Sequence, residues 1–266
     1  MGITPMKPAT RGATGPSGGG MRRGGGGGSA GPAVDPEEIP SWQTPSTQAL
    51  ESAASEGRPL VIYFPAENDT DASFAGKDIA HLSKNSALFV RIPYNPDREE
   101  SPWAADSAVP VSKILSENPS REYDIKVGVA TVIVADAYGN EYFRFGRVPA
   151  ATELKSSVDK VKEKAEDTNK KLQKNLDAAK AAWEAKDAKK ALGAILKNFK
   201  EDVIGLAAQE ETIRLYHEVM DAARARVGEL KAQGGDASVT ELKAMKATYK
   251  GTDVAKEIDE AIGASK

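Results

Sequence analysis

The sequence predicts an α/β sandwich, with a central mixed β-sheet flanked by helices, followed by an all-α region of helical hairpins. Over residues 41–166, short apolar runs typical of buried strands alternate with helical segments, and over residues 167–266 only helical periodicity remains. Residues 1–40 are rich in glycine and proline and have almost no apolar side chain to bury. We therefore expect a disordered tail, an α/β domain and a helical domain, in that order.

The composition suits a soluble protein and excludes one kind of chemistry. The 266 residues are 40% hydrophobic and 28% charged, with a net charge of -3, so no global charge draws the chain to nucleic acid or membranes. There is no cysteine, which excludes disulfides, thiolate nucleophiles and thiolate metal ligands. No apolar run is long enough for a membrane span or a secretory signal, so we expect a cytoplasmic protein. A start upstream of Met1 that added a signal peptide would make it periplasmic or secreted.

The α/β domain is predicted to begin with a helix capped at Thr44-Pro45 and ending at Glu56-Gly57. A buried strand, Leu60 to Phe64, follows, bounded by Gly-Arg-Pro on one side and by proline and polar residues on the other. A helix from Asp71 to Lys84 and a second buried strand, Ala87 to Ile92, come next.

The second half of this domain is predicted to contain a β-hairpin. A short helix around Ile114 is expected to stop at Asn118-Pro119. Strands from Val129 to Ala135 and from Glu141 to Phe145 are joined by turn residues, and a helix from Thr152 to Ala165 closes the domain. The predicted order is α-β-α-β-α-β-β-α.

This order and two stretches resemble the thioredoxin superfamily over roughly residues 42–165. The first stretch is the buried strand, polar loop and helix within Gly57 to Phe74, and the second is Val129-Ala130-Thr131. The resemblance places the family's two redox cysteines at Asn68 and Asp71, and its cis-proline at Ala130. Because thiol–disulfide exchange needs a thiolate, the resemblance implies a redox-inactive domain without oxidoreductase activity.

Other chemistries find little support. The oxygen-rich loop at Glu67, Asn68, Asp69 and Asp71 could suggest calcium, but it lacks the spacing and distal glutamate of a calcium loop. We interpret Asp69 or Asp71 instead as the cap of the following helix. The two histidines, His81 and His217, have no nucleophile near them in sequence, and Gly24 to Gly28 lacks the context of a phosphate loop. We expect no catalytic residue, metal or cofactor.

The helical domain is predicted from apolar residues at three- and four-residue intervals. The expected segments run from Leu172 to Trp183, from Asp187 to Phe199, from Val203 to Leu230, around Leu242 to Tyr249, and from Thr252 to Ile262, with a break at Gly234-Gly235-Asp236. Asp187 to Lys200 aligns with Asp236 to Lys250, and this faint repeat resembles tetratricopeptide-type α-hairpins, although its period is longer. The aromatic residues Trp183, Tyr216 and Tyr249 could line a groove for a partner, or, since they fall on the apolar stripe, could be core.

Together these features favour a non-enzymatic, redox-inactive protein that acts in protein–protein interaction or as a scaffold for an unidentified protein partner. The alternative is a ligand-binding protein or enzyme that resembles glutathione transferases, which also join the two kinds of domain. That family needs a cis-proline, absent at Ala130, and an acid–serine pair where this chain has Asn140-Glu141-Tyr142. A third hypothesis, nucleic-acid binding through Arg22-Arg23, rests on a single basic pair and ranks last.

Overall fold

The computed structural model describes residues 35–67, 69, 71–92 and 112–264. Residues 1–34 of the predicted tail therefore lie outside the described part. The remaining residues assigned to that tail are not a featureless leader, because Pro36–Glu38 form a short 3-10 helix, η1. The carbonyl of Glu38 accepts a hydrogen bond of 2.8 Å from the backbone N–H of Gly76.

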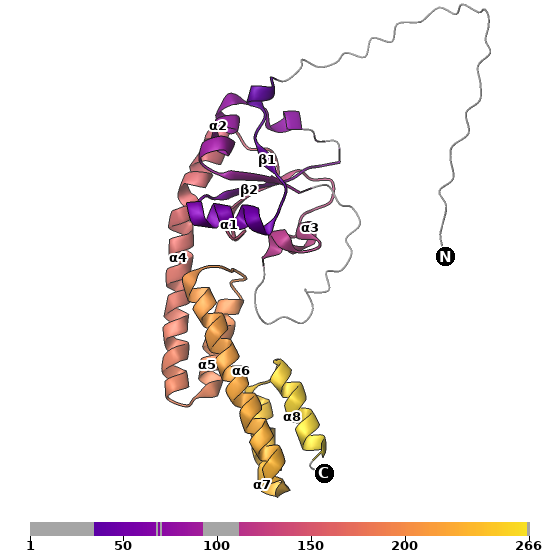
Figure 1. Ribbon diagram of the computed structural model, residues 1–266, viewed down its shortest axis with the longest axis vertical. Coiled ribbons are helices and arrows are strands. Elements are labelled where there is room, and N and C mark those ends of the chain that lie inside the picture. The colour runs from indigo at the N-terminus through magenta and orange to yellow at the C-terminus, as the bar shows by residue number, and fades with distance from the viewer. Residues whose placement is uncertain (1–34, 68, 70, 93–111, 265–266) are drawn as a thin grey trace, which may run out of the picture. The chain divides into compact units, whose positions relative to one another are not determined.

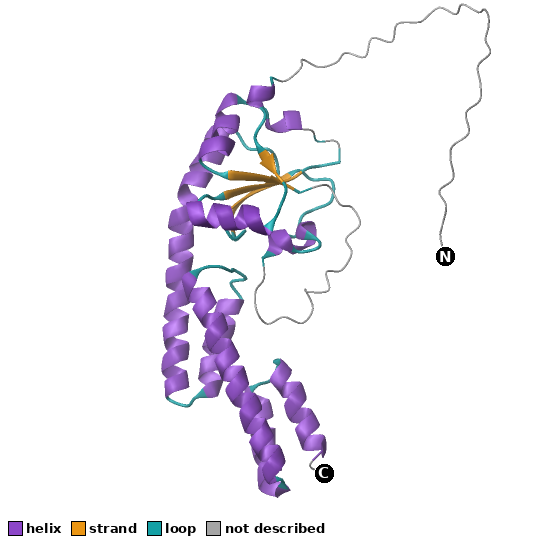
Figure 2. Ribbon diagram, in the orientation of Figure 1, coloured by secondary structure: helices purple, strands orange, loops and turns teal. Residues whose placement is uncertain are grey.

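A mixed sheet of five strands, in the order β1-β3-β2-β4-β5, forms the centre of the first region (Figures 1 and 2). The strands are β1 (Trp42–Gln43), β2 (Leu60–Phe64), β3 (Leu88–Arg91), β4 (Thr131–Ala135) and β5 (Glu141–Phe145). Strand β3 runs parallel to β1 and β2, whereas the β2/β4 and β4/β5 pairs are antiparallel. All residues of β2 are buried, which explains its continuous apolar sequence.

Helices cover both faces of this sheet. On one face, Leu50 and Ala53 of α1 (Thr47–Glu56) pack with Ile62 and Ile133, together with η3 (Lys113–Leu115) and the end of α3 (Pro119–Glu122). On the other face, Tyr63 and Val132 pack against η2 (Asp71–Phe74), α2 (Lys77–Asn85) and the first half of α4 (Ala151–Glu184). The predicted sheet with flanking helices is confirmed.

Several predicted helix ends were wrong, each for a local reason. The cap of α1 is Ser46, whose Oγ accepts from the Ala49 N–H at 3.1 Å, and not Thr44. The segment predicted as one helix from Asp71 to Lys84 is divided into η2 and α2, because the N–H of Gly76 binds Glu38 and not the preceding turn. Asn118-Pro119 begins a helix and does not end one, since Asn118 Oδ1 accepts from the Arg121 N–H at 3.1 Å.

The second region is helical, as predicted. It consists of the second half of α4, α5 (Ala188–Phe199), α6 (Ala207–Gln233), α7 (Gly235–Thr248) and α8 (Asp253–Ala264). The chain does not leave the helix near residue 166, where the predicted domain boundary falls. Helix α4 is continuous over 34 residues; it buries Leu154 and Val158 in the sheet region and Leu172 and Leu176 in the helical core. None of the described helices combines the length and the apolarity that a membrane span requires.

Candidate functional site

The loop after β2, where the thioredoxin resemblance places the redox pair, is tied to the ends of two strands. One oxygen of Asp69, Oδ2, accepts hydrogen bonds from the Tyr63 hydroxyl at 2.8 Å and from the Ala66 N–H at 2.9 Å. The Asp69 carbonyl accepts from Arg91 Nη2 at 3.2 Å, and the Arg91 guanidinium carbon lies 6.0 Å from the centre of the Tyr63 ring. Asp69 therefore holds the loop to β2 and β3.

The ring of Tyr63 belongs to an aromatic cluster with Trp42 and Phe74. The Tyr63 ring is 5.7 Å from Trp42 in a stacked arrangement and 4.7 Å from Phe74 in an edge-on one. Burial of the hydroxyl, together with its hydrogen bond to Asp69, raises the pKa of Tyr63 well above its usual value. The phenol therefore stays neutral at physiological pH and serves as a hydrogen-bond donor, which suits a structural role better than a nucleophilic one.

The structure brings only part of the predicted site together. Asn68 lies outside the described residues, and Asp71 is the first residue of η2. Ala130 is half-buried just before β4 and packs against the cluster that contains Tyr63 and Phe74. The prediction that Asp69 caps the next helix was wrong, because its carboxylate binds Tyr63 and Ala66 while α2 begins at Lys77 without any side-chain cap.

A second polar cluster, which the sequence did not predict, lies at the tip of the β4–β5 hairpin. Asp136 is 7% exposed, and its Oδ1 accepts from the backbone N–H groups of Tyr138 and Asn140, both at 3.0 Å. Its Oδ2 accepts from Asn140 Nδ2 at 2.7 Å and from the Tyr142 hydroxyl at 3.2 Å. Burial raises the pKa of Asp136, although these hydrogen bonds act to lower it.

The tip of the β4–β5 hairpin is hydrogen-bonded to the connection between α5 and α6. Asn140 Nδ2 donates to the Ile204 carbonyl at 2.8 Å, and Asn140 Oδ1 accepts from the Ile204 N–H at 2.9 Å, so one side-chain amide binds both backbone groups of a single residue. Next to this pair, the ring of Tyr138 lies so close to Gly205 that a Cβ there would be 2.2 Å from ring carbons. We call Asp136, Tyr138, Asn140, Ile204 and Gly205 the hairpin clasp. It joins the sheet region to the helical region at a point distant in sequence from α4.

A β-bulge in the β4–β5 hairpin accompanies the hydrogen bond from Tyr142 to Asp136. Val134 pairs with Phe143 but Ala135 pairs with Glu141, so Tyr142 has no partner on β4. Its hydroxyl is then directed to Asp136. The segment Asn140-Glu141-Tyr142, where glutathione transferases would carry an acid–serine pair, thus contributes Asn140 to the hairpin clasp, and Tyr142 donates a hydrogen bond to Asp136. The sequence signalled the turn but not its contact with Ile204, which is remote in the chain.

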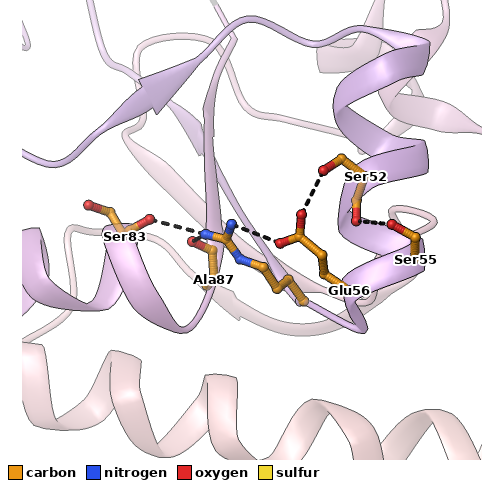
Figure 3. A network of polar contacts seen from close by, with 6 residues as sticks. Ser52, Ser55, Glu56, Ser83 and Ala87 are labelled. Carbon is orange, nitrogen blue, oxygen red and sulfur yellow. Dashed lines mark hydrogen bonds and ion pairs between the residues drawn. The ribbon is translucent and has the colours of Figure 1, made fainter.

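A third polar network lies at the amino ends of β2 and β3 (Figure 3). Arg58 Nη2 donates to the carbonyls of Ala87 at 2.9 Å and Ser83 at 3.3 Å, and Nη1 donates to Glu56 Oε2 at 3.3 Å. Ser52 Oγ completes the network by donating to the other oxygen of Glu56 at 2.9 Å. This network joins the end of α1 to the turn between α2 and β3, and it contains no group suited to catalysis.

The aromatic residues predicted to line a groove lie in the helical core. Tyr216 and Tyr249 are each 6% exposed, and Phe199 packs edge-on against Tyr216 at 5.3 Å. Trp183 is half-buried against the same core and donates from Nε1 to Glu218 Oε1 at 2.8 Å. His81 and His217 are exposed. Within the part of the chain that the structure describes, no three His, Asp or Glu side chains lie close enough together to hold a metal ion.

Comparison with known proteins does not assign this chain to a family. No protein-family model matches the sequence, and no curated protein sequence matches it. Among solved structures, a chain described as DsbH oxidoreductase matches with a TM-score of 0.31 and 16% sequence identity, over 48% of this chain and 91% of that one. A similarity at this TM-score supports no argument about fold or function, so the argument below rests on the residues themselves.

Proposed function

We propose that this chain is a redox-inactive protein with a thioredoxin-like sheet region, and that it acts as a scaffold that binds a partner protein. The observation that carries the proposal is the state of the loop after β2. The chain contains no cysteine, and the Asp69 carboxylate of the loop is engaged by Tyr63 and Ala66. A loop without cysteine has no means of thiol chemistry, and the Asp69 carboxylate is already bonded and therefore poorly suited to act as an acid or base.

The order of elements supports the thioredoxin-like part of the proposal. From α1 to α4 the chain follows the order α-β-α-β-α-β-β-α that the resemblance predicts, with two small additions, η2 and η3. Ala130, at the position of the family's cis-proline, packs in the same cluster as Tyr63 beside the loop. The helical hairpins α5–α6 and α7–α8 support, in the same way, the proposal of a tetratricopeptide-like second region.

The connections between the two regions suit a scaffold. Helix α4 contributes side chains to both cores, and the hairpin clasp fixes the α5–α6 connection to β4 and β5. A protein that presents two binding surfaces gains affinity when their separation is fixed, because the second contact is then intramolecular. Loosely linked domains would need neither a shared helix nor a buried amide pair.

The test is capture of partners from native cells by the full-length protein after mild cross-linking. Separate fragments ending and beginning at residue 166 would cut α4, so whole-chain variants are the better comparison. We expect a partner that wild type recovers in near-stoichiometric amounts and that Leu176→Asp, which places a charge in the helical core, does not. Failure to enrich any protein above the tag control would contradict the proposal. Retention on glutathione-agarose that free glutathione competes away would favour the glutathione-transferase-like alternative instead.

A further inference from the structure

Helix α5 carries one kind of charge on its outer face. Its exposed residues are Lys189, Lys190, Gly193 and Lys197, and Lys186 and Lys200, just beyond its ends, are exposed as well. At 100° per residue Lys189, Lys190, Gly193, Lys197 and Lys200 fall within an arc of roughly 100°, and Lys186 lies just before the first turn. We call this row the lysine face.

The charges of this face are largely unbalanced. Lys190 pairs with Asp187 at 2.7 Å, but no described carboxylate pairs with Lys186, Lys189, Lys197 or Lys200. On α6, by contrast, both Arg224 and Arg226 bind two carboxylates. Like charges three and four residues apart repel one another, so such a row is not expected for stability alone, least of all in a chain whose net charge is -3.

The middle of the row is open. Gly193 is an interior residue of α5, where glycine is less favourable than alanine, and nothing lies within 4 Å of the position of a Cβ there. No contact with a described residue therefore explains the glycine. On an exposed face, a missing side chain allows another backbone to approach closely.

We propose that the lysine face of α5 binds an acidic α-helix of a partner protein, an inference that rests on the scaffold function proposed above. From Lys189 to Lys200 the row is about 16 Å long, which matches about three turns of a second helix. Asp and Glu side chains at three- and four-residue intervals on that helix would meet the lysines, while its backbone passes over Gly193.

The same face suits other polyanions less well. It has no arginine, the residue that binds phosphate with two parallel hydrogen bonds, and no exposed aromatic ring on which a base could stack. The apolar side of α5, with Leu192 and Ile195, is buried in the helical core, so the helix has no apolar surface to insert into a lipid bilayer.

The experiment measures binding of a fluorescent helical peptide of about 20 residues, with glutamate along one face, to the full-length protein by anisotropy. The test variant is Lys189→Glu/Lys197→Glu/Lys200→Glu. The matched control is Lys160→Glu/Lys162→Glu/Lys164→Glu on α4, where Glu163 and Glu166 lie between and beside the exposed lysines. We expect the test variant to bind at least about tenfold more weakly and the control variant to bind within about twofold of wild type.

A second substitution guards against misfolding. Should circular dichroism show that the glutamate variant has lost helix, the corresponding glutamine variant is measured. A smaller weakening, of about threefold or more, is then expected, because glutamine removes the charge without reversing it. The proposal is overturned if the wild type does not bind the peptide, or if the test variant binds as well as wild type. It is also overturned if single-stranded RNA or phosphatidylserine vesicles bind the lysine face more tightly than the peptide.

Cell capture separates this inference from the function on which it rests. If wild type and test variant recover the same partner from native cells, the lysine face is not its binding surface, although the scaffold function stands. If wild type recovers no partner, the scaffold function itself fails.

Discussion

Replacing Asn140 with alanine should release the helical region from the tip of the β4–β5 hairpin. The substitution removes three hydrogen bonds, from Nδ2 to Asp136 Oδ2 and to the Ile204 carbonyl, and from the Ile204 N–H to Oδ1. A neutral hydrogen bond contributes about 1 kcal/mol net and one to a charged group about 1.5–3 kcal/mol, which gives about 4 kcal/mol in total. Water can reach the half-buried Ile204 backbone in the variant, so we expect a loss of about 3 kcal/mol.

Asn140→Asp provides a control of nearly the same shape. It keeps an acceptor for the Ile204 N–H but places a second carboxylate against Asp136, in an environment that already raises the Asp136 pKa through burial. Two carboxylates at this distance cannot both ionise cheaply, so the pKa of the pair in the folded state lies above its value in the unfolded chain. The resulting cost is present above that folded-state pKa and disappears as the pH falls through it.

Both variants can be measured by urea unfolding followed by circular dichroism. Asn140→Ala should lose stability at neutral pH and regain only part of it on acidification. The part regained is the bond to the Asp136 carboxylate, whose loss raises the Asp136 pKa further, whereas the two bonds to Ile204 do not depend on pH. Asn140→Asp should be destabilised at neutral pH and approach wild type at about pH 4, near the pKa of an unperturbed aspartate. A loss below about 1 kcal/mol for Asn140→Ala would show that water replaces the clasp without cost, and the reasoning would be refuted.

Three further predictions concern single positions. Gly205→Ala should lower the free energy of unfolding by about 2 kcal/mol, because Gly205 has a φ of 71° and a Cβ would meet the Tyr138 ring. The control, Gly228→Ala on the exposed surface of α6, should raise the melting temperature slightly in thermal unfolding. Tyr63→Phe should cost about 1 kcal/mol of stability, because it removes one hydrogen bond to Asp69. Asp69→Ala should cost about 2–3 kcal/mol, because it leaves both the Tyr63 hydroxyl and the Ala66 N–H without an acceptor. Equal losses for the two variants in urea unfolding would show that Asp69 does not hold the loop to β2. Arg58→Ala should cost about 1–2 kcal/mol of stability, because it removes the hydrogen bonds to Glu56, Ser83 and Ala87. Arg58→Lys should be destabilised as well, because one ammonium group cannot reach all three acceptors together. A lysine variant as stable as wild type in thermal unfolding would contradict this.

The sequence predicted best those elements whose boundaries are marked by strong local signals. Strands β2 and β5 have the predicted bounds, because β2 is an apolar run between breakers and β5 follows a well-defined turn. Strand β1 was not predicted, because its two residues are a strand only through pairing with β3. The break at Gly76 also depends on a distant partner, the Glu38 carbonyl, which no local pattern reveals.

The candidate site divides in the same way. The absence of a thiol could be read directly from composition. The role of Asp69 could not, because an aspartate before a helix predicts a cap, and only the fold shows that the Tyr63 hydroxyl lies within reach. The hairpin clasp was missed for a similar reason: Asp136 and Asn140 are ordinary turn residues until the α5–α6 connection packs against them.

Helix α4 is a different case, because its sequence did contain the missed signal. Leu154, Val158 and Val161 face the sheet, and Leu172, Leu176 and Ala179 face the helical core. At 100° per residue both sets fall on the same side of one helix, with the half-buried Ala165 between them. No glycine or proline lies between Ala151 and Glu184, so nothing in the sequence ends a helix at residue 165.

This continuity allows the contribution of the clasp to be separated from that of α4. Seven alanines inserted after Glu166 lengthen the helix by about 10 Å and rotate its second half by only about 20°, so both cores keep their buried faces. Asn140 and Ile204 would then be too far apart to bond. The insertion removes the two bonds to Ile204 but keeps the bond from Asn140 to Asp136 within the hairpin. We therefore expect Asn140→Ala to cost about 2 kcal/mol less when added to the insertion than it costs in the wild-type chain. The four proteins form a double-mutant cycle in urea unfolding. Additive losses would mean that Asn140 stabilises the hairpin alone and that its bonds to Ile204 contribute no stability.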